Sequence, residues 1–84
     1  MEFLLVNFDE KRQLVINTVT QGWTNSVELL PAETYDVTLT GKRNFSPDSQ
    51  RITLRYTAPT DPAEITFHLL PPSAVTPDIA GGAA

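Results

Sequence analysis

The sequence predicts an all-β protein, namely a small antiparallel β-sandwich or open barrel of about six strands, followed by a disordered C-terminal tail. Two observations lead to this fold class. Apolar and polar residues alternate with a period of two in several short segments, whereas no window shows the i, i+3, i+4, i+7 spacing of an amphipathic helix. Thr, Val and Ile are also frequent, which disfavours helix. Two layers are expected because a single sheet would leave its apolar face in water.

Three strands in the second half of the chain share one alternating pattern. We expect strands over residues 34–40, 51–57 and 63–69, each with one apolar and one polar face. If these strands are neighbours, their acidic and basic side chains lie side by side and their threonine hydroxyls can form hydrogen bonds between the strands. This polar face is then either a solvated surface or a flat docking surface. The apolar members are Tyr35, Val37, Leu39, Ile52, Leu54, Tyr56, Ile65, Phe67 and Leu69, and the polar ones are Asp36, Thr38, Thr40, Arg51, Thr53, Arg55, Glu64, Thr66 and His68.

The first half of the chain is predicted to form two hairpins. Residues 3–8 and 14–19 are more uniformly apolar and β-branched than the later segments, and they flank a turn-like acidic and basic tetrapeptide. We therefore expect a hairpin whose strands are covered on both faces or lie centrally. Val27 and Leu29 alternate with Ser26 and Glu28, and the following Pro31 predicts a turn into the strand at Tyr35. Residues 41–49 and 58–62 are expected to be loops.

The composition divides the chain into a folded domain and a tail. Residues 1–70 are predicted to form one domain, and residues 71–84, rich in Pro, Ala and Gly, a flexible tail that cannot bury enough apolar surface to become ordered. A domain of this size has a thin core, so help from a partner or a second copy is expected.

Charge and the amino terminus narrow the partners and the compartment. Six Lys and Arg against ten Asp and Glu give a net charge of −4, which argues against nucleic acid as a partner. The short apolar run near the start is too short for a signal peptide or a membrane span. We expect a cytoplasmic protein that does not bind membranes, or a domain excised from an exported one.

The residue types needed for catalysis are scarce. The chain has no cysteine and one histidine, His68, and no serine lies in a Gly-x-Ser-x-Gly turn. His68 suits a general base or a metal ligand, but lacks a second histidine or cysteine beside it. We therefore expect no enzyme, no cofactor and no metal.

The candidate binding residues are aromatic or basic. Trp23 lies near a turn and either fills the core or anchors a partner or a sugar ring, a role that Phe45 in the next predicted loop would share. The basic candidates lie on or beside the predicted polar face. They are Lys42, Arg43, Arg51, Arg55 and His68.

Residues 29–39, with the sequence LLPAETYDVTL, resemble a stretch found in two groups of β-sandwich modules. The Leu-x-Pro-x-x-x-Tyr-x-Val pattern is similar to that of fibronectin type III and immunoglobulin-like modules, in which the tyrosine packs inward and its hydroxyl bonds to the chain upstream. The stretch also resembles carboxypeptidase-regulatory-like and PEGA-type domains, although Ala32-Glu33 stands where they have a glycine. The resemblance implies a sandwich and a non-catalytic accessory role.

Together these observations predict a non-enzymatic module that binds another protein or associates with itself. Threonine- and valine-rich strands with unpaired edges favour this function. The alternative is a β-domain that binds carbohydrate or another ligand through Trp23 or Phe45.

Overall fold

The computed structural model describes residues 1–71, which contain nine β-strands and no helix. The all-β prediction is confirmed, and residues 72–84 of the predicted tail lie outside the described residues. Three of the strands were not predicted as separate elements, namely β3, β6 and β9. The strands are β1 (Glu2–Asn7), β2 (Gln13–Ile16), β3 (Val19–Trp23), β4 (Val27–Leu30), β5 (Thr34–Leu39), β6 (Phe45–Ser46), β7 (Gln50–Thr53), β8 (Ala63–Thr66) and β9 (His68–Leu69).

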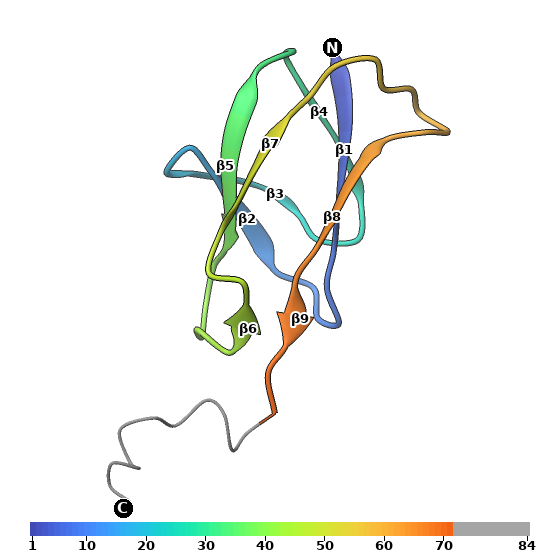
Figure 1. The fold of residues 1–84 in the computed structure, drawn as a ribbon. Helices are drawn as coiled ribbons and strands as arrows, with labels where there is room; N and C mark the ends of the chain where they lie inside the picture. Colours follow the sequence, from blue (N-terminus) through green and yellow to red (C-terminus); the bar gives the residue numbers. More distant parts are fainter. Residues whose placement is uncertain (72–84) are drawn as a thin grey trace, which may run out of the picture.

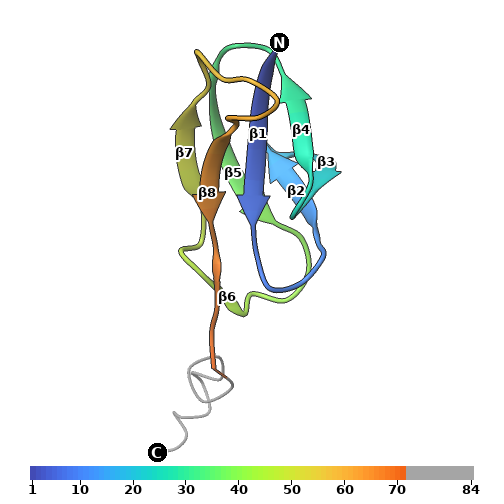
Figure 2. The ribbon, with the colours of Figure 1, turned by 90° about the vertical axis from the view of Figure 1, so that its right-hand side faces the viewer.

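The strands form a sandwich of two facing sheets. A three-stranded sheet has the order β4-β1-β8, and a four-stranded sheet has the order β3-β2-β5-β7. Figure 1 shows the two layers, and Figure 2 looks onto the three-stranded sheet with the other sheet behind it. A small sheet of β6 and β9 closes one end. All strand pairs are antiparallel, as predicted, except β1 and β8, which run parallel.

The core fills the space between the layers with side chains from both sheets. Alternate residues of β1, β2 and β5 point inward, as period-two strands require. At the closed end, the ring of Phe45 packs edge to face against Phe8 and Phe67, with centroids 6.1 and 5.6 Å away. The buried hydrophobic residues are Leu4, Val6, Phe8, Leu14, Ile16, Leu30, Tyr35, Val37, Leu39, Phe45, Leu54 and Phe67.

Both predicted hairpins are wrong, because β1 and β2 lie in different sheets, and so do β4 and β5. β1 pairs with β4 and β8, whereas β2 pairs with β3 and β5. The central position foreseen for these two strands is confirmed, since each has a neighbour on both sides. A hairpin would have placed β1 and β2 in one layer, whereas the crossing lets their inner faces cover each other.

A tyrosine stabilises the crossing from β4 to β5. Tyr35 is buried, and its hydroxyl donates a hydrogen bond of 2.7 Å to the carbonyl oxygen of Pro31, four residues upstream. This is the bond that the sequence resemblance implies for this residue. Since the phenol is removed from water and lies near the carboxylate of Glu33, the pKa of Tyr35 is raised.

Two of the predicted strands end earlier than the alternation suggests. β7 ends at Thr53, and Tyr56 has a φ of 57°, so its ring leaves the core and is 90% exposed. Residues 63–69 divide at Phe67 into β8, which belongs to the three-stranded sheet, and β9, which pairs with β6. In residues 1–71, no helix is long and apolar enough to cross a membrane.

Candidate interaction surfaces

The outer face of the four-stranded sheet is polar, and part of it was foreseen. β5 and β7 are neighbours, so Asp36 meets Arg51 at 2.9 Å and the hydroxyls of Thr34 and Thr53 lie 2.7 Å apart. The hydrogen bond from Arg51 lowers the pKa of Asp36, and Asp36 raises the pKa of Arg51. Both side chains are exposed, and exposed pairs of this kind contribute little to stability.

The third predicted member of that polar face lies elsewhere. β8 belongs to the three-stranded sheet, so Glu64 and Thr66 lie on the opposite side of the sandwich from Arg51. His68 is exposed in β9, opposite Ser46. The condition for one shared polar face, that the three strands are neighbours, is therefore met only by β5 and β7. Within residues 1–71, no group of three or more His, Cys, Asp or Glu side chains is placed to hold a metal ion.

Lys42 and Arg43 are exposed in the loop after β5. Arg12 holds this loop from beneath, because its guanidinium donates to the carbonyl oxygens of Thr40 (3.3 Å) and Lys42 (2.8 Å) and to Oδ1 of Asn44 (2.8 Å). The structure thus presents the two basic side chains on an anchored loop rather than on the sheet itself.

Phe45 is not available as a surface anchor. Its side chain is only 3% exposed, because it packs between Phe8 and Phe67. The guanidinium carbon of Arg12 lies 5.2 Å from the centroid of Phe8 and 5.9 Å from that of Phe45, within the range of cation–π contacts. The proposed binding role of Phe45 is corrected to a core role.

Trp23 lies at the surface, so it does not fill the core. It ends β3 and is 41% exposed. The Lys11 ammonium lies 4.8 Å from the centroid of the indole ring, and the backbone N–H of Trp23 donates to Oε2 of Glu28 at 3.1 Å. The tryptophan is therefore fixed at its backbone and has a cation over its ring.

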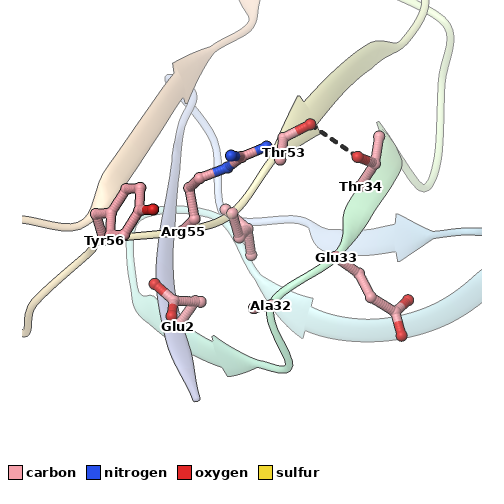
Figure 3. A pocket seen from close by; sticks show the side chains of 8 residues that line it. Glu2, Ala32, Glu33, Thr34, Thr53, Arg55 and Tyr56 are labelled. Atoms are coloured by element: carbon pink, nitrogen blue, oxygen red, sulfur yellow. Dashed lines mark hydrogen bonds between the residues drawn. The ribbon is translucent and has the colours of Figure 1, made fainter.

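Arg55 borders a shallow hollow of about 520 Å³ between the ends of β1, β5 and β7 (Figure 3). Tyr56, which the sequence interpretation placed in the core, also lines it. Glu2 is already engaged there, since its carboxylate accepts hydrogen bonds from the N–H and hydroxyl of Thr57 at 3.0 and 2.6 Å, which lowers the pKa of Glu2. Figure 3 shows Glu33 pointing away from Arg55. The hollow therefore has a mixed charge and no converging set of polar groups.

The outer face of the three-stranded sheet carries an apolar surface that the sequence interpretation missed. Phe3 lies opposite Leu29 and Leu5 opposite Val27, and directly opposed residues share a face. Val27 and Leu29 are 45% and 55% exposed, and Phe3 and Leu5 are half-buried. We call these four residues the apolar outer face.

The sequence pattern did not predict this surface because the inward-facing residues of β4 are shifted by one position. The alternation of Val27 and Leu29 with polar neighbours suggested that these two side chains point inward. In the structure Leu30 is buried, so the period of two sends Glu28 inward and Val27 and Leu29 outward. The apolar pair Leu29-Leu30 was the signal that either residue could be the inward one.

Comparisons of the chain with models of protein families, with curated proteins and with solved structures gave no match. The resemblance of residues 29–39 to sandwich modules therefore stays a hypothesis.

Proposed function

We propose that this chain is a non-enzymatic interaction or assembly module that binds a protein surface through its apolar outer face. The observation that carries this proposal is the contrast between the two outer faces of one sandwich. In the four-stranded sheet, β5 and β7 present charged residues and threonines to water, whereas Phe3, Leu5, Val27 and Leu29 lie together on the other sheet. Contiguous exposed apolar residues with a polar border are typical of protein-binding surfaces.

The polar border is visible on the same sheet. β8 contributes Glu64 and Thr66 to the outer face, and the side-chain amide of Asn7 donates to the Glu64 carboxylate at 3.1 Å. The apolar residues are thus confined to β1 and β4, and hydrogen-bonded polar groups surround one side of them. This arrangement matches an interface with an apolar centre and a wet rim.

A pair of matched substitutions tests this function. Val27→Lys places a charge in the apolar outer face, whereas Val19→Lys makes the same change at a similarly exposed valine in β3 of the other sheet. The wild-type protein and the Val19→Lys variant, immobilised separately, should capture the same specific protein from a lysate of the source organism or bind a second copy, and Val27→Lys should do neither. If all three proteins behave alike, the proposal fails.

A carbohydrate-binding role is the second candidate, because Trp23 is exposed. A sugar would have to stack on the ring beside the Lys11 ammonium. Titration with a set of oligosaccharides should then shift or quench the fluorescence of Trp23, the only tryptophan of the chain. Unchanged emission across the set would remove this candidate.

A further inference from the structure

We infer that the partner of the apolar outer face is a second copy of this chain, packed face to face in a twofold-symmetric dimer. This inference rests on the proposed function and names its partner. It depends on three properties of the three-stranded sheet, which are its blocked edges, the distribution of its charges and its area.

The first property is that both edges of the sheet are blocked, which leaves its face as the open surface. At the β4 edge Glu28 points inward and accepts the N–H of Trp23, and an inward charge on an edge strand discourages pairing with another strand. Pro31 follows directly and has no N–H to donate. At the β8 edge the side-chain amide of Gln50 donates to the carbonyl oxygen of Thr66 at 2.7 Å. Strand addition, the other common way for sheets to associate, is therefore disfavoured.

The second property is the position of the charges, which selects one of two twofold arrangements. An axis parallel to the strands would place β4 of one copy over β8 of the other, and Leu29 and Val27 would bury Glu64. An axis across the strands places β4 over β4 and β1 over β1, running in opposite directions. Apolar residues then meet apolar residues, and Glu64 stays at the rim. A second copy also supplies a sheet with the same twist, which aligned sheet packing requires.

The third property is the area, which sets the strength of the dimer. Three strands spaced by about 4.8 Å, with about 3.3 Å per residue along β1, make a face roughly 14 Å wide and 20 Å long. Two such faces have a combined flat area of about 560 Å², below the roughly 1,000 Å² expected of a stable specific interface. The dimer should therefore be weak, and we expect a dissociation constant on the order of 100 µM, above the micromolar to picomolar range of standard-size interfaces. This strength suits reversible assembly or a subunit contact within a larger array.

Sedimentation velocity from about 10 µM to about 1 mM spans the expected dissociation constant. The wild-type protein should shift from monomer to dimer over this range, and Val19→Lys should shift in the same way. Val27→Lys should raise the dissociation constant at least tenfold, because the charge enters the interface twice. Leu29→Lys is the second variant on this face, and circular dichroism verifies that each variant is folded.

Nuclear magnetic resonance of the wild-type protein locates the contact without any substitution. Backbone amide shifts that depend on concentration should cluster at β1 and β4. A protein that stays monomeric throughout, or shifts that cluster on the four-stranded sheet, would overturn the dimer. If such a monomer still captures another protein through a surface that Val27→Lys destroys, the proposed function survives and only the identity of the partner is wrong. If it captures nothing, both proposals fail.

Discussion

Replacement of Arg12 tests whether one side chain holds the closed end of the sandwich together. Its guanidinium donates to two carbonyl oxygens and one side-chain amide of the loop at residues 40–44, and it also pairs with Glu10. It further covers the rings of Phe8 and Phe45. Its side chain is only 12% exposed, so water replaces these contacts poorly.

The magnitude follows from the number of contacts that are lost. Hydrogen bonds from charged donors contribute about 1.5–3 kcal/mol each where water is excluded, and partial solvation of the loop carbonyls in the variant recovers part of this. Loss of the ring contacts adds about 0.5–1 kcal/mol. We expect Arg12→Ala to lower the free energy of unfolding by about 3 kcal/mol, a large share of the stability of so small a domain. Arg12→Lys keeps the charge but not the planar guanidinium group, so its free energy of unfolding should lie between those of the wild type and Arg12→Ala.

Urea denaturation followed by circular dichroism measures this loss, with Arg51→Ala as the matched control. Arg51 carries the same group, but it is exposed and makes its ion pair with Asp36 in water. Its removal should leave the midpoint almost unchanged. If Arg12→Ala shifts the midpoint no further than Arg51→Ala does, the reasoning about this contact network is refuted.

Three further predictions concern pH and backbone geometry. Because burial raises the pKa of Tyr35 in the folded state, the contribution of Tyr35 to stability should be constant below pH 10 and fall above it. Tyr35→Phe should reduce this alkaline fall, and identical alkaline denaturation curves would contradict the prediction. Because hydrogen bonds lower the pKa of Glu2, stability present above its ordinary pKa of 4.5 should be lost as the pH falls through the lowered value, and acid titration of Glu2→Gln should show a shallower loss. Gly22 has a φ of 77° and an added Cβ would meet Cδ of Glu28 at 2.8 Å, whereas at Gly41 (φ 88°) the nearest atom is 3.6 Å away. Gly22→Ala should therefore cost more than Gly41→Ala, for which the left-handed backbone alone costs about 1 kcal/mol, and equal melting temperatures would rule out the clash.

The sequence by itself determined the class of the fold and the faces of its clearest strands. In β5, Tyr35, Val37 and Leu39 alternate with polar residues and are all buried, because a side chain on a strand has only two directions to take. The sequence also predicted that Asp36 and Arg51 lie side by side, provided that their two strands are neighbours, and the structure meets this condition.

Strand partners and surfaces required the tertiary structure. The turn between β1 and β2 looks the same in sequence whether the chain returns in one sheet or crosses to the other, because alternation carries no information about which strand lies alongside. Phe45 looked like a surface residue in a polar loop, and only its edge-to-face packing against Phe8 and Phe67 shows that it belongs to the core.

The apolar outer face shows the same division between sequence and structure. Leu29 and Leu30 are adjacent, so one must point inward and the other outward, and nothing local decides which. Packing decides it: Leu30 fits the space between the sheets, and Leu29 is left on the surface beside Phe3. The apolar residues of the proposed interface can therefore be found in the sequence. Only the pairing of β4 with β1 brings them together on one face. The tertiary structure decides this pairing, because strands distant in sequence become neighbours by burying their inner faces in one core.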